Sequence, residues 1–430
     1  MGVKVAGQST NYELSYSSEV YVEGILMSES LYQGKFFDYF SGLNDSRMEG
    51  KIWHRLTDIL FIVTCGIICG YDEFELIHVW AKAPDTQKWL KKYIALPNGI
   101  PSLSTLKRGF SVIRPEEFST RFISWMNAVL QLPEKDVVSV DGKTSRGSKD
   151  ERKGQKALHM VSALCHSHGL VIGQVKTDEK SNEITAIPEL LDQLLIEGSI
   201  VTIDAIGLQT KIVTKIVNDN KADYVINLKG NQEVFQQEVK EYFTDLEQSG
   251  KLEQIKHQAV QEGAHVKNSA GLQVLSTLEK GHGRIERRTY YYSTDINWMV
   301  DAKRDWTKLI GIGMVLREVE YTAEPGKTTN ETVFYVGSVG NVADFARAAR
   351  THWGVESMHW SLDVIFGDDH NRTRETAAAQ NLAIVKRIVF NTLKNETKIY
   401  PKMSKPKKRV VAATDPSYRD VLINLNFKDR

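Results

Sequence analysis

Three carboxylates on three separate elements are the residues of this sequence best suited to chemistry. Asp141 and Asp204 each directly follow a short apolar run rich in β-branched residues, which predicts a strand. Glu356 lies on a predicted helix, where one surface acid means little by itself. The residues three, four or seven positions away share its helix face; they are His352, Trp353, His359, Trp360 and Asp363. Carboxylate oxygens suit Mg²⁺ and Mn²⁺, and two such ions about 3.5–4 Å apart can drive an in-line displacement at phosphorus. The three acids together predict a divalent-metal site for phosphate chemistry.

The predicted order of elements brings the two aspartates together. From residue 136 onward we expect three strands, a helix, a strand, a helix, a strand and a helix. These elements cover residues 137–140, 157–165, 170–175, 184–195, 199–203, 208–218, 224–228 and 232–246. Ser181 or Asn182 is expected to cap the first of these helices. This is the order of a ribonuclease-H-like α/β core, in which the first and fourth strands are neighbours, so Asp141 and Asp204 are expected to meet.

Regions of different composition surround that core. Residues 1–130 predict a small all-helical N-terminal domain, with helices over 31–40, 53–70, 73–83, 87–94 and 115–130. The core itself comprises residues 131–248 and 337–395. A β-rich insertion covers residues 249–336, with strands over 284–293, 309–317 and 332–336. It delays the last core helix, 342–366, which Asn341 is expected to cap. Residues 396–430 are predicted to be a basic C-terminal tail.

Length, charge and cysteine content limit the class of protein. A chain of 430 residues exceeds one ordinary core, and a net charge of +1 gives no compositional argument for nucleic acid. DNA contacts would have to come from local basic clusters, although a solvated loop is the commoner meaning of such runs. One cluster is Lys143, Arg146, Lys149, Arg152, Lys153 and Lys156, and the other is Lys402, Lys405, Lys407, Lys408 and Arg409. The sequence has three cysteines, too few for a disulfide framework, and shows no secretory signal and no apolar run of about 20 residues. We therefore expect a cytoplasmic, nucleoid-associated protein without a membrane partner.

Six ordered blocks of the sequence resemble a known family. They are residues 140–148 (VDGKTSRGS), 180–190 (KSNEITAIPEL), 203–207 (IDAIG), 223–232 (DYVINLKGNQ), 282–286 (HGRIE) and 352–360 (HWGVESMHW). Together with residues 96–101 (LPNGIP), they are similar to the signature blocks of insertion-sequence DDE transposases of the ISAs type, which include the proteins associated with H-repeats of Rhs elements. The resemblance covers nearly the whole chain. The chain departs from the family pattern at Ser357, where asparagine is expected, and at Asp368, where glutamate is expected.

The resemblance implies an activity, a cofactor and a partner. The acidic triad of the family falls on Asp141, Asp204 and Glu356, the same residues that the predicted topology selects. It implies metal-dependent cleavage and strand transfer on double-stranded DNA at the terminal inverted repeats of its own element, with two Mg²⁺ ions per active site and Mn²⁺ as a substitute. Paired element ends predict a homodimer on DNA. End recognition is assigned to the N-terminal domain only from its separate composition and its small basic group, Lys107, Arg108 and Arg114.

Basic and polar residues near the predicted acids are candidates for DNA contacts. They are Lys143, Arg146, Lys229, Asn231, His282, Arg284, Arg350, His352 and Arg372. Phosphate contacts from such side chains give affinity and salt dependence but no choice of sequence. Trp353 and Trp360, seven residues apart, are expected to pack in the core. For His352 and His359, metal ligation ranks below phosphate hydrogen bonding and core packing, because the expected site has only oxygen ligands.

Other functions fit the sequence less well. Glu356 and His359, and likewise Glu75 and His78, have the Glu-x-x-His spacing of di-iron helix bundles, but the β-rich middle of the chain offers no four-helix bundle. No phosphate-loop motif occurs. A DNA-binding or targeting protein that has stopped using its catalytic acids, and a DNA nuclease without joining activity, remain as alternatives. The three acids argue against a protein that only binds DNA, because their negative charge repels phosphate. A nuclease would use the same triad, so the sequence does not separate it from a transposase.

Overall fold

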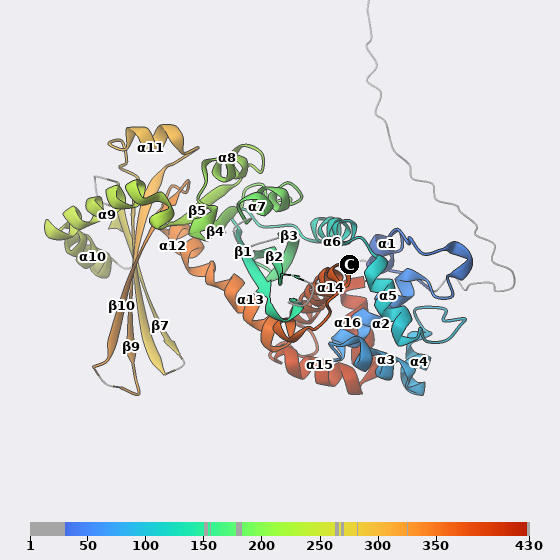
Figure 1. The fold of residues 1–430 in the computed structure, drawn as a ribbon. Helices are drawn as coiled ribbons and strands as arrows, with labels where there is room; N and C mark the ends of the chain where they lie inside the picture. The colour runs from blue at the N-terminus through green and yellow to red at the C-terminus, as the bar shows by residue number, and fades with distance from the viewer. Residues whose placement is uncertain are drawn as a thin grey trace, which may run out of the picture.

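The computed structural model describes residues 31–149, 154, 156–177, 183–262, 266–267, 271–281, 283–324 and 326–427. It shows a mixed α/β protein built around a ten-stranded sheet with the strand order β3-β2-β1-β4-β5-β10-β9-β8-β7-β6. A helical body lies beside the β1–β3 end of this sheet, and the β7–β10 strands extend from the other end (Figure 1). Among the helices within these ranges, none is both long enough and apolar enough to cross a membrane.

Six helices precede the first strand. They are α1 (Lys35–Phe40), α2 (Leu56–Ile68), α3 (Phe74–Lys82), α4 (Pro84–Leu90), α5 (Leu103–Val112) and α6 (Pro115–Val129). Five of them match predicted helices with shifted ends, but the sequence pattern does not predict α5, because Gly109 lowers its helix propensity. The structure explains this glycine: a Cβ added at Gly109 would lie 2.8 Å from Cδ1 of Ile59 on α2. Ser102 starts α5 by accepting a hydrogen bond from the backbone N–H of Thr105 at 3.2 Å.

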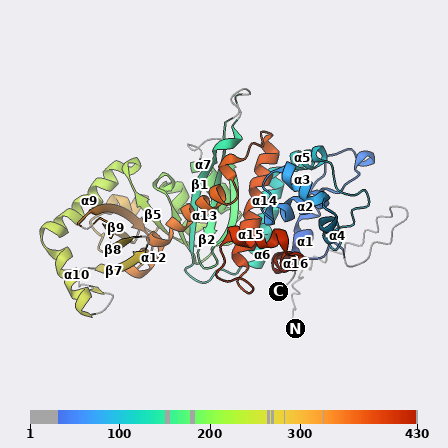
Figure 2. The ribbon, with the colours of Figure 1, turned by 90° about the horizontal axis from the view of Figure 1, so that it is seen from below.

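Three C-terminal helices pack against the N-terminal helices. They are α14 (Thr376–Asn395), α15 (Lys405–Thr414) and α16 (Pro416–Phe427). α14 contacts α2, α5 and α6, while α16 contacts α1 (Figure 2). The prediction of a basic tail is therefore wrong for residues 405–427. Lys408 and Arg409 are buried: Lys408 pairs with Glu396 at 3.1 Å, and Arg409 Nε donates to the carbonyl oxygen of Ile67 at 3.1 Å.

The strands of the core have the predicted order. They are β1 (Val137–Ser145), β2 (Leu158–Cys165), β3 (Leu170–Thr177), β4 (Ile200–Ile203) and β5 (Asp223–Leu228), with the helices α7 (Glu183–Leu191), α8 (Thr210–Asn218) and α9 (Glu233–Gln248). β1, β2 and β3 pair antiparallel, whereas β4 pairs parallel with both β1 and β5. β1 continues five residues past its predicted end because residues 141–145 stay paired with β2. The predicted caps of α7, Ser181 and Asn182, lie outside the described residues.

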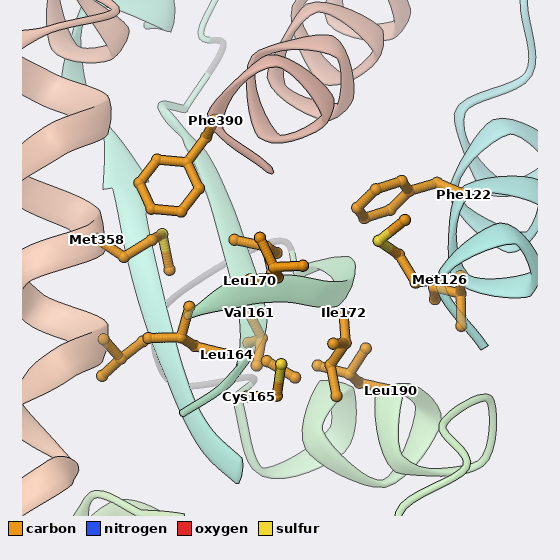
Figure 3. Packing of buried hydrophobic residues seen from close by; sticks show 14 of the residues in the cluster. Phe122, Met126, Val161, Leu164, Cys165, Leu170, Ile172, Leu190, Met358 and Phe390 are labelled. Atoms are coloured by element: carbon orange, nitrogen blue, oxygen red, sulfur yellow. The ribbon is translucent and has the colours of Figure 1, made fainter. Parts of the chain in front are cut away.

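Buried apolar side chains from several helices meet on the β2–β3 hairpin (Figure 3). They include Phe122 and Met126 of α6, Leu190 of α7, Met358 of α13 and Phe390 of α14. The helix that carries Glu356 is thereby fixed to the central sheet.

The insertion continues the core sheet. It contains α10 (Lys251–Glu262), β6 (Val266–Lys267), β7 (Leu272–Gly281), β8 (Arg284–Ser293), α11 (Val300–Asp305), β9 (Gly311–Tyr321) and β10 (Thr328–Gly337). The three predicted strands correspond to β8, β9 and β10, while β6, β7 and the two helices are not predicted. β10 pairs antiparallel with β5, from Phe334 opposite Leu228 to Gly337 opposite Val225. The insertion and the core therefore share one sheet.

The single helix predicted over 342–366 is wrong, because two helices occupy this stretch. α12 (Val342–Thr351) begins at Asn341, whose Oδ1 accepts the N–H of Asp344 at 2.9 Å, so the predicted cap is confirmed. α13 (Trp353–Val364) begins after a break at His352. Gly354 allows α13 to approach the turn after β2, since a Cβ there would lie 2.4 Å from Cε1 of His166. α12 contacts β7 and β8 of the insertion and β1, β4 and β5 of the core, whereas α13 contacts β1, β2 and α14.

Candidate active site

Asp141 and Asp204 lie at the same point of the sheet, where β1 and β4 stop pairing. The parallel register ends with Val140 opposite Ile203, and each aspartate is the next residue of its chain segment. Asp204 accepts the backbone N–H of Ala205 at 2.6 Å and pairs with Lys229 at 3.3 Å. Burial, the largest influence, would raise the pKa of Asp204, but this hydrogen bond and the Lys229 ammonium outweigh it and lower the pKa. The predicted meeting of the two strand ends is confirmed.

Glu356 faces the two aspartates from the first turn of α13. Burial and then the negative charge of Asp141 raise the pKa of Glu356, and Asp204 adds to this effect. The three carboxylates thus repel one another, and divalent cations would relieve that repulsion, so the donor set fits hard metal ions. Within the described part of the chain, the three acids do not form a tight cluster with all ligand atoms within 4.8 Å of one another.

Two histidines of α13 and its preceding break surround the acids. His359 Nδ1 lies 3.4 Å from Asp141 Oδ2, while its buried Nε2 has no hydrogen-bond partner among the described residues. His352 Nδ1 lies 3.1 Å from Thr202 Oγ1. Burial lowers the pKa of His352, and this effect outweighs the opposing charges of Asp141 and Asp204. Burial thus favours the neutral form of the His352 imidazole.

A buried histidine–glutamate pair lies under β1 and is not predicted from the sequence. His159 Nε2 lies 2.7 Å from Glu183 Oε1, and its Nδ1 lies 2.7 Å from Thr144 Oγ1. Gly142 leaves room for this pair, because a Cβ there would lie 2.3 Å from Glu183 Oε1. The glycine after Asp141 and the glutamate of the 180–190 block are the sequence signals for it, but neither indicates the other.

Lys143 does not lie on the surface, contrary to the prediction that it contacts DNA. Its side chain is 6% exposed and pairs with Asp363 on α13 and, at 3.5 Å, with Asp369. Asp369 also accepts the backbone N–H of Arg146 at 3.1 Å. Lys143 therefore joins the strand of Asp141 to the helix of Glu356, a role that sequence spacing does not reveal.

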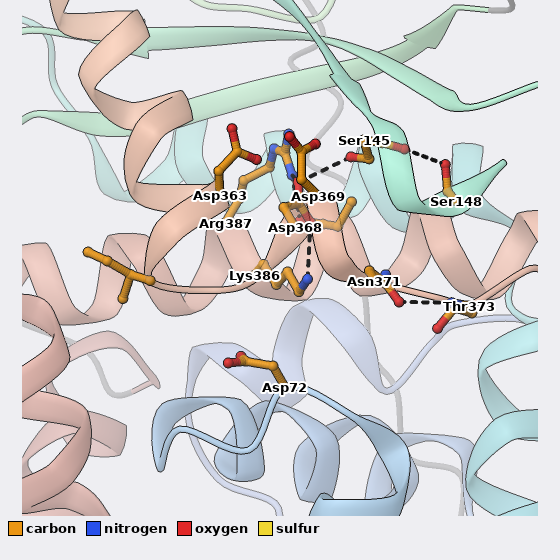
Figure 4. Close-up of polar contacts among 12 residues, drawn as sticks. Asp72, Ser145, Ser148, Asp363, Asp368, Asp369, Asn371, Thr373, Lys386 and Arg387 are labelled. Atoms are coloured by element: carbon orange, nitrogen blue, oxygen red, sulfur yellow. Dashed lines mark hydrogen bonds and ion pairs between the residues drawn. The ribbon is translucent and has the colours of Figure 1, made fainter.

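A fully buried ionic cluster lies directly behind this contact (Figure 4). Asp368 accepts hydrogen bonds from Lys386 Nζ at 3.1 Å and from Ser145 Oγ at 3.3 Å, and lies 4.0 Å from Arg387 Nη1. Asp368, Lys386 and Arg387 are each at most 1% exposed. Burial alone would raise the pKa of Asp368, but the two cations outweigh burial and lower it. β1, the segment after α13, and α14 are thus held together by charge.

The other predicted DNA contacts lie in three places. Arg146 and Arg372 line a groove of about 1580 Å³ formed by α3, α5, the segment after β1 and the segment that leads into α14. Its other charged lining residues are the cations Lys107, Lys149 and Arg374 and the acids Glu73, Glu75, Asp369 and Glu375. Lys229 and Asn231 stay close to Asp204, and Asn231 Nδ2 donates to the carbonyl oxygen of Ala205 at 2.7 Å. Arg284 and Arg350 line a second groove beside α13. His282 lies outside the described residues.

The expectation that Trp353 and Trp360 pack in the core is wrong. They are 48% and 60% exposed, respectively, and lie on the same face of α13 as Glu356. The buried face of α13 instead carries Val355, Met358 and Leu362.

Comparison with known proteins identifies the family. A family model described as "Transposase DDE domain" matches residues 132–392, and one described as "DDE_Tnp_1-associated" matches residues 37–126. The chain is 36% identical to "Putative transposase YncI" of Escherichia coli O157:H7, over 88% of this chain and 92% of that protein. It is 35% identical to "H repeat-associated putative transposase YhhI" of Escherichia coli strain K12, over 89% and 96%.

A likeness to a solved structure is more distant. The cryo-EM structure of a piggyBac transposase synaptic complex with hairpin DNA matches with a TM-score of 0.40 and 9% sequence identity, covering 91% of this chain and 78% of that chain. The match of the DDE domain over more than half of the chain, together with relatives above 30% identity over nearly their full length, shows that the chain belongs to the DDE transposase family that includes the H-repeat-associated proteins.

Proposed function

We propose that this chain is a metal-dependent DNA transposase that cuts and joins strands at the terminal inverted repeats of its own element. The observation that carries the proposal is that Asp141 and Asp204 follow the last paired residues of β1 and β4, and that their charges act on Glu356 of α13. We further infer that β1–β5 with their helices form a ribonuclease-H-like core, because the sheet order 3-2-1-4-5 and the strand directions are those of that fold.

The three acids would hold two Mg²⁺ ions, or Mn²⁺ in their place. Bound there, the ions supply activation of a water or 3′-hydroxyl nucleophile and stabilisation of the leaving oxygen. Asp141 and Asp204, which follow the last paired residues of the neighbouring strands β1 and β4, would hold the ions together with Glu356 of α13. His359 orients the carboxylate of Asp141, and Lys229 lies where it can hold a phosphate beside Asp204.

Duplex DNA would lie along the large groove that Arg146 and Arg372 line. Its lining carries the cations Lys107, Arg146, Lys149, Arg372 and Arg374. Such cations bind the DNA backbone whatever its sequence. Because two element ends must be processed, we expect two copies of the chain on DNA.

End recognition is assigned to the N-terminal helices. A groove of about 850 Å³ there is lined by Lys51, the exposed Trp53 and Arg108. Deletion of residues 1–130 cannot test this assignment, because α14 packs against α2, α5 and α6. Arg108→Gln tests it instead: binding to the element ends should weaken more than binding to unrelated DNA.

The decisive experiment measures Mg²⁺- or Mn²⁺-dependent cleavage and joining on a DNA fragment that carries the flanks of this gene. Asp204→Asn should abolish both reactions. Asp223→Asn is the matched control, because Asp223 starts β5 far from the carboxyl end of the sheet and pairs with Lys308 at 2.7 Å. Cutting without joined products would indicate a nuclease. Binding without cutting, equal in wild type and Asp204→Asn, would refute the proposal in favour of a DNA-binding protein.

A further inference from the structure

An uncovered stripe of side chains runs along α13 on both sides of the proposed catalytic acid. Glu356 and Ser357 are adjacent, Trp353 and Trp360 lie three or four residues to either side of them, and all four side chains are exposed. Tryptophan is largely buried in most folded chains. Two exposed tryptophans, each about one turn from Glu356 on one helix face, indicate a surface that another molecule covers.

A basic groove adjoins this stripe on the side of Trp353. It has a volume of about 680 Å³ and lies between α12–α13 and the β7–β9 strands. Its lining includes Trp353, Ser357 and two glutamates, and its cations are Lys280, Arg284, Arg288, Arg317 and Arg350. The five cations outnumber the two glutamates, so the groove attracts an anion.

The two glutamates hold the arginines in place. Glu279 accepts two hydrogen bonds of 2.9 Å from Arg350, and these bonds and charges lower the pKa of Glu279 to about 2. The buried Glu286 pairs with Arg288 and Arg317. Their guanidinium groups are therefore fixed before any ligand arrives, and fixed forks bind phosphate with little loss of side-chain entropy.

The size and chemistry of the groove fit an unpaired nucleotide better than a duplex. Its volume falls within the range of about 300–1,000 Å³ that is typical of sites for small organic ligands. Aromatic side chains stack on the faces of unpaired bases, which a duplex hides between neighbouring base pairs. Trp353 supplies such a face in a groove that is also lined by five cations.

We propose that this groove binds one or a few unpaired nucleotides of the DNA strand at the element end, with a base stacked on Trp353 and the phosphates on the arginines around Arg284. The inference rests on the proposed function, since it places this strand beside Glu356. The β7–β10 strands then hold one strand away from the duplex while α13 presents the catalytic acid to the other.

Binding of two fluorescently labelled DNA probes tests the proposal without metal and without cleavage. One probe is a blunt duplex with the element-end sequence, and the other is the same duplex with a short single-stranded extension. We expect wild type to bind the extended probe more tightly. Trp353→Ala should weaken binding of the extended probe by about 5- to 150-fold, the range for loss of one stacked base, and leave binding of the blunt duplex unchanged. Trp353→Phe should restore much of the difference. Trp298→Ala, which removes another exposed tryptophan, located at the start of α11, is the control.

A second pair of variants separates the two faces of β8. Arg284 and Arg287 pair with glutamates at the same distance, 3.6 Å, and are 43% and 56% exposed, but only Arg284 lines the groove. Arg284→Gln should weaken binding of the extended probe and reduce its salt dependence, whereas Arg287→Gln should not.

Each outcome is decisive. Equal binding of both probes by wild type, or equal losses for both probes in Trp353→Ala, would overturn the inference. The proposed function would survive that result if cleavage still depended on Asp204. Failure to bind either probe would overturn the proposed function itself and the inference with it.

Discussion

Asp368→Asn should lower the free energy of unfolding by about 3–5 kcal/mol, the usual effect of removing one partner from a buried ion pair. The substitution keeps the shape of the side chain but removes the charge that Lys386 and Arg387 share. Both cations are at most 1% exposed, so water cannot take the place of the lost carboxylate. Arg387 already has a buried Nε without a hydrogen-bond partner among the described residues.

The neighbouring residue provides the matched control. Asp369 has a side chain that is 28% exposed and lies 3.5 Å from Lys143, which keeps Asp363 as a second partner. Solvent screening weakens such a partly exposed ion pair, so Asp369→Asn should lower the free energy of unfolding by about 1 kcal/mol or less. Urea denaturation followed by circular dichroism would measure both variants against wild type.

The dependence on pH has a definite sign. The pKa of Asp368 is lower in the folded chain than in the unfolded chain. Its stabilising contribution is therefore fully present above the unfolded pKa of about 3.9 and is lost as the pH falls through the folded pKa. The gap between wild type and Asp368→Asn should stay constant from pH 5 to 8 and shrink only in stronger acid. Equal costs for Asp368→Asn and Asp369→Asn would refute the reasoning from burial.

Two further predictions concern the acids and their support. Glu356→Gln should raise the unfolding temperature at pH 7 in metal-free buffer. Folding raises the pKa of Glu356, so its charged form destabilises the folded state at pH 7, and glutamine lacks that charge. A lower unfolding temperature would contradict this reasoning. Lys143→Met should lower the free energy of unfolding by about 1–3 kcal/mol, which is less than the loss of a fully buried ion pair because Asp363 and Asp369 are about 30% exposed. The same substitution should slow cleavage but leave DNA affinity and its salt dependence unchanged. A smaller salt slope with unchanged stability would instead make Lys143 a phosphate ligand.

Local patterns were sufficient to predict the strands of the core. The run before Asp141, the β2–β3 hairpin and the segment before Asp204 each have a strand pattern that is complete within a few residues. Since the order of elements determines which strands can be neighbours, the meeting of Asp141 and Asp204 could also be predicted. The cap at Asn341 is likewise local, because its partner Asp344 is three residues away.

Features that depend on distant residues could not be predicted. Lys143 looks like a DNA contact until Asp363, which is far along the chain, is placed beside it. The close approach of Gly354 on α13 to His166 in the turn after β2 also joins residues that are far apart in the sequence. Apolar spacing along a helix also does not reveal which face is covered, so Trp353 and Trp360 have the pattern of core residues although both are exposed.

The pairing of β10 with β5 bears on the fate of damaged copies of this gene. If residues 249–336 were lost, the backbone groups of residues 225–228 that now bond to β10 would become an open sheet edge. Open edges pair with other chains, which leads to aggregation. A copy that decayed by losing this segment would therefore not leave a small folded remnant that still binds DNA. We expect it to yield protein that misassembles through the exposed edge of β5.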